Sequence, residues 1–240
     1  MNIAIIVQAR LGSTRLPRKV LAEAGGKPLL SYVVERVRMS RCSPVVVVCP
    51  EGEQREIAAA AAGAFVYSGP EHDVRERFVR YLQGTVGFQH FVRICADSPW
   101  IDPKVIDYVV AAHRMAWPEN TSLARGLAFV TSNTKPRSFP AGQCVEVADV
   151  AGFLTGNKIG RVGRGEPVGD AMTDSDREHV FPWYYRNCPT ANVVNPLGDY
   201  SHVNLCVDTA EDFERFSDVI GRLERPHWAY GWREIAEMYA

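Results

Sequence analysis

A run of basic residues follows the first apolar segment of the chain and could bind phosphate groups. Residues 8–19 contain no acidic residue and four cations: Arg10, Arg15, Arg18 and Lys19. Gly12 permits a tight turn whose backbone amides, with the hydroxyls of Ser13 and Thr14, can form an anion-binding concavity. One guanidinium group can donate two parallel hydrogen bonds to the oxygens of a phosphate. This stretch therefore predicts a polyphosphate site, although a basic surface loop would share its composition.

The known phosphate motifs do not account for this loop. The pattern GxxxxGK[ST] is absent, so a nucleoside triphosphate would be held differently from the way that an ATPase or kinase holds it. A second glycine-rich segment, at about residues 156–175, narrowly misses GxGxxG and follows no predicted strand. We interpret that segment as a flexible insertion, and a basic lid over phosphates is the alternative.

Two aspartates could hold a divalent metal ion. Asp97 follows a predicted strand at residues 91–94, and Asp208 follows another at residues 203–207. Ligands bind at the carboxyl ends of the strands in open parallel sheets, and Mg²⁺ prefers few carboxylates together with waters and phosphates. An aspartate in a turn or at a helix start is the structural alternative, particularly for Asp208, which precedes Thr209. The sequence offers no His and Cys ligand set for zinc.

The order of apolar segments predicts the scaffold that positions these residues. Short runs rich in Val and Ile alternate with segments of helical period, which favours an α/β fold with a mainly parallel sheet. The expected strands cover residues 3–7, 45–49, 64–67, 91–94, 128–131, 145–148 and 203–207. One helix is expected to begin at Pro28, and the others to cover residues 53–62, 74–82, 103–115, 176–185 and 210–223.

Composition limits the class of protein. The 240 residues carry a net charge of -1, and 46% are hydrophobic, which excludes disordered and collagen-like chains and favours one domain over residues 1–240. A near-neutral chain has no general attraction for nucleic acid or an anionic membrane, so we expect neither partner. Six widely spaced cysteines and the lack of a signal segment predict a reduced, cytoplasmic protein.

Several ordered motifs resemble the sugar-acid cytidylyltransferases, which comprise the CMP-3-deoxy-manno-octulosonate synthetases and the spore-coat polysaccharide cytidylyltransferase-like proteins. The second group is the more similar. The matching residues are Ala9-Arg10, Ser13-Thr14-Arg15-Leu16-Pro17, Lys19, Gly26-Lys27-Pro28-Leu29-Leu30, Ser68-Gly69, Asp73-Val74, Arg77, Asp97-Ser98-Pro99, Arg177-Glu178-His179-Val180 and Val207-Asp208-Thr209.

The resemblance implies a fold, a reaction and a set of residues. The fold would be a three-layer α/β/α domain like that of the nucleotide-diphospho-sugar transferases, and the reaction would transfer CMP from CTP to a sugar acid. Mg²⁺ would be held by Asp97 and Asp208, and a homodimer is expected. The implied catalytic residues are Arg15, Lys19 and Asp97. The implied nucleotide contacts are Ala9, Arg10, Gly12, Ser13, Arg15, Lys19, Arg77 and Asp97. The implied substrate contacts are Arg137, Gln143, Glu146, Glu178 and His179.

The chain departs from these relatives near the implied acceptor side. Ala141 and Cys144 stand where the relatives usually have an arginine and an aspartate. A nucleotide-binding relative without catalysis therefore remains an alternative. A sugar-1-phosphate nucleotidyltransferase or a glycosyltransferase of similar fold is another.

Overall fold

The computed structural model describes residues 2–117, 128–159 and 172–239 of the chain. Most of the predicted glycine-rich insertion, residues 160–171, lies outside these ranges. In the described part of the chain, no helix is long and apolar enough to cross a membrane.

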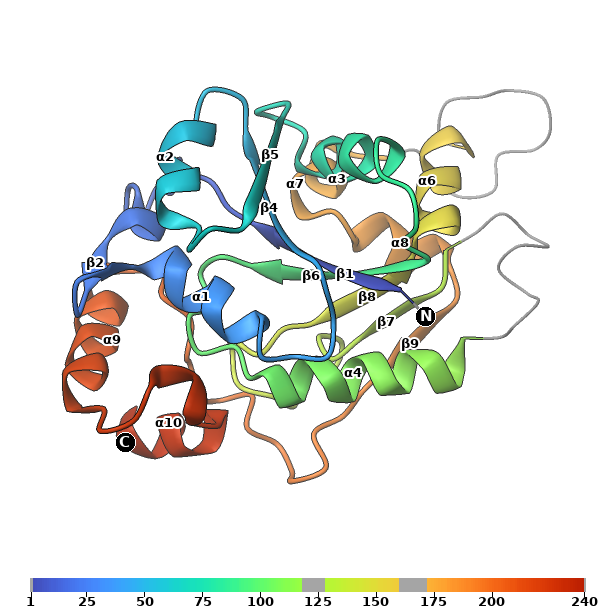
Figure 1. Ribbon diagram of the computed structural model, residues 1–240. Helices are drawn as coiled ribbons and strands as arrows, with labels where there is room; N and C mark the ends of the chain where they lie inside the picture. Colours follow the sequence, from blue (N-terminus) through green and yellow to red (C-terminus); the bar gives the residue numbers. More distant parts are fainter. Residues whose placement is uncertain (1, 118–127, 160–171, 240) are drawn as a thin grey trace.

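A seven-stranded sheet crosses the middle of the molecule (Figure 1). The strands follow the order β5-β4-β1-β6-β8-β7-β9. Pairing is parallel from β5 to β6 and between β7 and β9, whereas β8 runs antiparallel to β6 and β7. The α/β class and the mainly parallel sheet are thus confirmed. The strand bounds are β1 Ile3–Gln8, β4 Val45–Pro50, β5 Phe65–Gly69, β6 His90–Cys95, β7 Val130–Ser132, β8 Glu146–Asp149 and β9 Thr190–Asn192.

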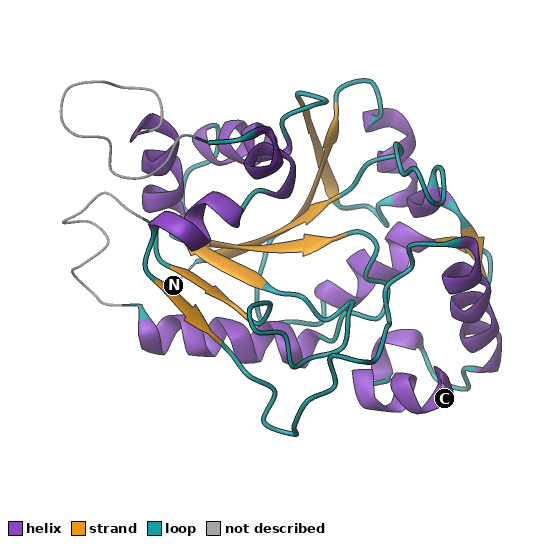
Figure 2. Ribbon diagram, turned by 180° about the vertical axis from the view of Figure 1, so that it is seen from behind, coloured by secondary structure: helices purple, strands orange, loops and turns teal. Residues whose placement is uncertain are grey.

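Helices cover both faces of the sheet and complete three layers (Figures 1 and 2). Side chains of alternate residues of β1 point to opposite faces of the sheet: Ile5 and Val7 belong to one buried cluster, and Ile6 belongs to the other. The first cluster takes side chains from α1 Leu29–Val37, α2 Gln54–Ala60, α4 Pro103–Ala116, α9 Ala210–Arg222 and α10 Trp232–Tyr239. The second lies under α3 Val74–Gln83, α6 Val150–Ile159, α7 Asp174–His179 and α8 Pro182–Asn187. A short hairpin, β2 Glu23–Ala24 and β3 Lys27–Pro28, follows the 3-10 turn η1 Lys19–Leu21, and a second such turn, η2 His227–Ala229, precedes α10.

Local sequence explains where the helices begin. Pro103 occupies the first turn of α4, and the Asp102 carboxylate accepts a hydrogen bond from the Lys104 amide at 2.8 Å. Thr209 begins α9 through a reciprocal capping box with Asp212. These caps satisfy amides that have no partner inside the helix.

Two of the expected elements were wrong. Residues 203–207 form no strand: Ala141 and Asn204 make a single parallel bridge, and Gly142, at a φ of 90°, turns the chain away after it. The helix expected over residues 176–185 is divided into α7 and α8. Val180 adopts a φ of 69° between them, and Pro182 has no amide hydrogen with which to continue the first helix. The sequence interpretation also missed β9, α6 and α10.

A buried histidine pair lies at the start of β6. His113 Nε2 is 3.0 Å from His90 Nδ1, and its Nδ1 is 2.9 Å from the Thr131 hydroxyl. Burial lowers the pKa of His90 to about 4 and that of His113 to about 3. The native state therefore resists protonation at a pH where the unfolded chain, with histidine pKa values near ~6.5, binds protons.

This pair predicts loss of stability on mild acidification. Because the unfolded state binds more protons below about pH 6.5, the two histidines together should lower the free energy of unfolding by roughly 3 to 4 kcal/mol between pH 7 and pH 5. Burial also lowers the pKa of His227, which acts in the same direction. Urea unfolding at the two pH values measures the change, and His113→Met should make it smaller. An equal change in wild type and variant would contradict the role of the pair.

Candidate active site

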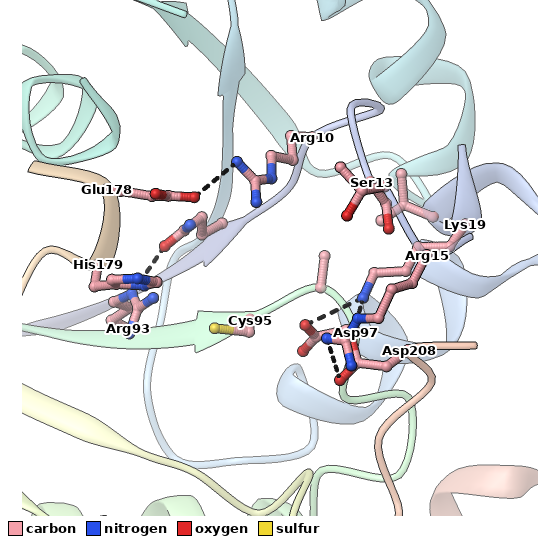
Figure 3. Close-up of a pocket in the computed structure, with 14 residues that line it drawn as sticks. Arg10, Ser13, Arg15, Lys19, Arg93, Cys95, Asp97, Glu178, His179 and Asp208 are labelled. Carbon is pink, nitrogen blue, oxygen red and sulfur yellow. Dashed lines mark hydrogen bonds and ion pairs between the residues drawn. The ribbon is translucent and has the colours of Figure 1, made fainter. Parts of the chain in front are cut away.

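A cavity of about 290 Å³ opens at the carboxyl ends of β1 and β6 (Figure 3). Its wall combines cations from the loop after β1 with carboxylates from three other parts of the chain. The lining residues are Gln8, Arg10, Ser13, Thr14, Arg15, Lys19, Val20, Arg93, Cys95, Ala96, Asp97, Glu178, His179 and Asp208. The chain segments that the sequence singled out for phosphate, metal and acceptor therefore meet in one place.

The basic loop after β1 is held by its own backbone and by one carboxylate. The Leu11 carbonyl accepts hydrogen bonds from the Ser13 and Arg18 amides at 2.8 and 3.0 Å, and the Leu11 amide donates to Glu53 Oε2 at 2.8 Å. Ala9 is buried and pairs with β4, outside the cavity wall. Gly12 also lies outside the lining and has no left-handed φ, so the turn itself does not require glycine there.

Lys19 joins the two predicted metal ligands. Its Nζ lies 2.8 Å from Asp208 Oδ1 and 3.3 Å from Asp97 Oδ2, and it also donates to the Val207 carbonyl at 3.0 Å. Arg15 reaches the other Asp208 oxygen at 3.0 Å. Burial lowers the pKa of Lys19, but the neighbouring Asp97 and Asp208 outweigh burial and raise the pKa above its usual value. The ammonium group is therefore firmly charged.

The position of Asp208 does not depend on a strand. The Leu205 amide donates to the Ala141 carbonyl and the Val207 amide to the Asp97 carbonyl, both at 2.9 Å. A Cβ at Gly142 would lie 2.9 Å from the Leu205 backbone, so glycine permits this close approach. The segment is thus fixed beside Asp97 even though it forms no ladder.

The carboxylates of Asp97 and Asp208 do not act as helix caps. Thr209, and not Asp208, supplies the side-chain cap of α9. Asp97 Oδ1 accepts from the Ser98 hydroxyl at 3.2 Å, while its other oxygen faces Lys19. In the described residues, no group of three or more His, Cys, Asp or Glu side chains could hold a metal ion. A metal here would have two protein carboxylates and would need its remaining ligands from substrate and water.

The other end of the cavity brings together residues from β1, β6 and α7 (Figure 3). Arg10 NH1 lies 3.3 Å from Glu178 Oε1, which ties the basic loop to α7. His179 and Arg93 both line this end of the cavity, and Arg93 Nε donates to Gln8 Oε1 at 2.9 Å. Cys95 lines the wall between the two ends, and burial raises the pKa of its thiol to about 12, so the thiol is neutral.

Besides Ala9 and Gly12, four of the predicted site residues do not line the cavity. Arg77 is fully buried on α3 and donates to the Pro70 and Glu71 carbonyls, so it fixes the turn before that helix. Gln143 is fully buried, and its amide binds backbone groups of Trp100 and Asp102. The two others are Arg137, an exposed residue that donates to the Ser201 carbonyl, and Glu146, which pairs with Arg93.

The sequence interpretation missed Arg93 and Gln8 as cavity residues and Glu53 as the anchor of the basic loop. Arg93 carried a signal, because it is the one charged residue in the otherwise apolar segment 91–94. Gln8 and Glu53 carried none, since a polar residue at the end of a strand or before a helix is ordinary.

Comparison with known proteins identifies a matching family and several relatives of the chain. The model of a family described as cytidylyltransferase matches residues 4–141. Spore coat polysaccharide biosynthesis protein SpsF of Bacillus subtilis is 29% identical over 239 residues, which cover 94% of this chain and 89% of that protein. The 3-deoxy-manno-octulosonate cytidylyltransferase of Paramagnetospirillum magneticum is 30% identical over 161 residues, 65% of this chain and 62% of the relative.

Solved structures agree on the fold. A cytidylyltransferase from Leptospira borgpetersenii superimposes with a TM-score of 0.79 at 25% identity, over 99% of this chain and 93% of that one. A CMP:2-keto-3-deoxy-manno-octonic acid synthetase complexed with CTP gives a TM-score of 0.57 at 16% identity, over 92% of this chain and 99% of that one. The second likeness concerns the fold alone.

Proposed function

This chain belongs to the cytidylyltransferase family, and on that premise we propose that it transfers CMP from CTP to a hydroxyl group of a sugar acid and releases pyrophosphate. The observation that carries the proposal is the cluster of Lys19, Arg15, Asp97 and Asp208 at one end of the cavity. A polyphosphate needs cations, and a metal bound to that polyphosphate needs a few carboxylates. The cluster provides both at the carboxyl ends of the sheet strands, where such folds bind ligands.

The chain's own residues would act mainly by alignment and charge. Arg15 and Lys19 would bind phosphate oxygens and stabilise the negative charge that moves onto the departing pyrophosphate. The backbone and hydroxyl groups of the basic loop would fix the triphosphate, so that the acceptor hydroxyl lies in line with the α-phosphorus. Arg10 and His179, at the other end of the cavity, would contact the parts of CTP and of the acceptor that meet there. These interactions do not require a covalent intermediate.

The donor set fits magnesium. Oxygen atoms of Asp97 and Asp208 both lie within 3.3 Å of Lys19 Nζ, so the two carboxylates already converge on one cationic centre. Mg²⁺ is commonly bound by one or two carboxylates plus phosphate oxygens and water. Bound there, Mg²⁺ would neutralise charge on the triphosphate and polarise the oxygen atoms at the reacting phosphorus.

The acceptor class is the finer part of the proposal. It is supported by the names of the relatives, which include a spore-coat polysaccharide biosynthesis protein and two 3-deoxy-manno-octulosonate cytidylyltransferases. The chain spans only 62% and 53% of the two cytidylyltransferases. Cationic side chains at the second end of the cavity are compatible with an anionic acceptor.

One experiment tests reaction and acceptor together. We expect pyrophosphate release from CTP with at least one acid from a panel of nulosonic acids, and much slower release with UTP, GTP or ATP. Faster release with a sugar 1-phosphate would identify a sugar-1-phosphate nucleotidyltransferase. CTP binding without pyrophosphate release for any acceptor would indicate a nucleotide-binding protein without catalysis, and would contradict the proposal.

A further inference from the structure

Arg93 is a charged residue in the centre of an apolar sheet. It lies on β6, paired in register with Ile6 of β1 on one side and with Glu146 of β8 on the other. Its neighbours along the strand, Val92 and Ile94, are fully buried. Because side chains alternate along a strand, Arg93 points to the opposite face from these two, the face covered by α7 and α8.

The Arg93 guanidinium is fixed in orientation from two sides. Its Nε donates to Gln8 Oε1 at 2.9 Å, and its NH1 group pairs with Glu146 Oε2. The second Glu146 oxygen accepts from the Tyr185 hydroxyl at 2.6 Å, which holds that carboxylate in place. Only 12% of the Arg93 side chain and 10% of the Glu146 side chain are exposed. Such a buried, oriented arginine is preorganised for a planar anion.

The remaining edge of this guanidinium faces the cavity. Arg93 lines the cavity wall, and in the described part of the chain no side chain or carbonyl accepts a hydrogen bond from its NH2 group. Burial lowers the pKa of Arg93, while Cys95 and Glu146 raise it above the usual value. Burial raises the pKa of the Cys95 thiol and keeps it neutral, so the paired Glu146 is the partner that matters for Arg93. The guanidinium is therefore charged and can donate to a ligand.

Arg93 lies apart from the proposed phosphate and metal groups. Figure 3 shows Arg15, Lys19, Asp97 and Asp208 together at one end of the cavity and Arg93 with His179 at the other. A triphosphate held by the first group leaves the second for the molecule that reacts with it. We propose that Arg93 binds the carboxylate of the acceptor and thereby selects an anionic acceptor over a neutral one. This inference rests on the proposed function.

Glu146 and Tyr185 are positioning residues in this arrangement. Glu146 was expected from the sequence to contact the substrate, but it lies outside the cavity lining and acts on Arg93. The acceptor carboxylate would take the guanidinium edge that Glu146 leaves free. A nucleotide phosphate bound to the same edge is the competing assignment, and it predicts a different response of CTP affinity.

Binding measurements with charged and neutral probes test the inference. Wild-type protein saturated with a non-hydrolysable CTP analogue is titrated by calorimetry with each nulosonic acid of the panel and with its neutral methyl ester. We expect at least one acid to bind about tenfold or more tightly than its ester, because paired charged hydrogen bonds to a carboxylate are strong. In Arg93→Gln this preference should disappear, while affinities for the ester and for the CTP analogue stay within about twofold.

Two further variants guard against a folding defect. Arg93→Lys keeps a cation opposite Glu146 but loses the paired geometry, so it should fold and still lose most of the preference. Arg41→Gln, at a largely exposed arginine of the surface, should retain the whole preference. Far-UV circular dichroism and thermal unfolding verify that each variant is folded.

The outcomes separate the inference from the proposed function. The inference is overturned if no acid binds wild type more tightly than its ester, if the preference survives in Arg93→Gln and Arg93→Lys, or if CTP affinity falls instead. Pyrophosphate release that ignores the acceptor charge leaves the proposed function intact and removes the inference. Acid binding that depends on Arg93, in the absence of pyrophosphate release, supports the inference and contradicts the proposed function.

Discussion

Asp97→Asn is expected to lower pyrophosphate release by about 100-fold or more while changing the free energy of unfolding by less than about 1 kcal/mol. The substitution keeps the shape of the side chain but removes a negative charge from the proposed metal ligand. Little stability is at risk, because the contact with Lys19 Nζ is 3.3 Å long and 30% of the Asp97 side chain is exposed. Release rates measured against Mg²⁺ concentration, with urea unfolding, give both quantities.

Asp107→Asn provides the matched control. Asp107 lies on α4, where its carboxylate accepts from the Arg41 amide at 2.8 Å, outside the cavity. The same chemical change there should leave catalysis intact. Asp208→Asn should behave like Asp97→Asn, since Asp208 meets the same lysine. Near-wild-type Mg²⁺ dependence in both cavity variants would remove the proposed metal role.

Lys19→Met is expected to reduce kcat/KM for CTP roughly 30-fold to 1000-fold, which corresponds to a loss of about 2 to 4 kcal/mol of transition-state stabilisation. Lys19 is the most enclosed cation of the phosphate end, with 11% of its side chain exposed, so its charge is poorly replaced by water. Its removal also leaves Asp97 and Asp208 without their shared cation. The variant should therefore be less stable at neutral pH, and Mg²⁺ should raise its melting temperature more than it raises that of wild type.

Two comparison variants make the Lys19 result interpretable. Arg15→Ala should have a smaller effect, because 65% of the Arg15 side chain is exposed. Lys27→Met, at a lysine that pairs with Glu35 away from the cavity, should leave turnover unchanged. If Lys19→Met keeps wild-type kcat/KM for CTP in a folded protein, the phosphate end has been assigned incorrectly.

The convergence of the site could be predicted from the sequence because it depends on topology. Parallel strands present their carboxyl ends at one edge, and β1 and β6 are neighbouring strands, so the residues that follow them lie near each other. Lys19 and Asp97, 78 residues apart, are in contact for this reason. The alternation of strands and helices predicted the shared edge, and the strand order that makes β1 and β6 neighbours came from the structure.

The individual roles were less predictable because they depend on contacts over long sequence separations. Gln143 belongs to an apparent substrate motif, yet its amide lies at the right place to bind two backbone groups 41 and 43 residues away. Residues 203–207 have strand-like apolar residues, but only one bridge forms because Gly142 turns the chain. Neither outcome is encoded in a local pattern.

The cavity is nearly self-neutralising. Its cations already face carboxylates of the chain: Arg10 faces Glu178, Arg15 and Lys19 face Asp208 and Asp97, and Arg93 faces Glu146. Equal and opposite charges a few ångströms apart produce little field beyond a Debye length of about 8 to 10 Å, so a distant polyanion would be drawn in only weakly. An arriving triphosphate must instead exchange one set of ion pairs for another. Discrimination would then follow from how closely its oxygen atoms reproduce the spacing of the carboxylates they replace, and the sheer amount of positive charge would matter less.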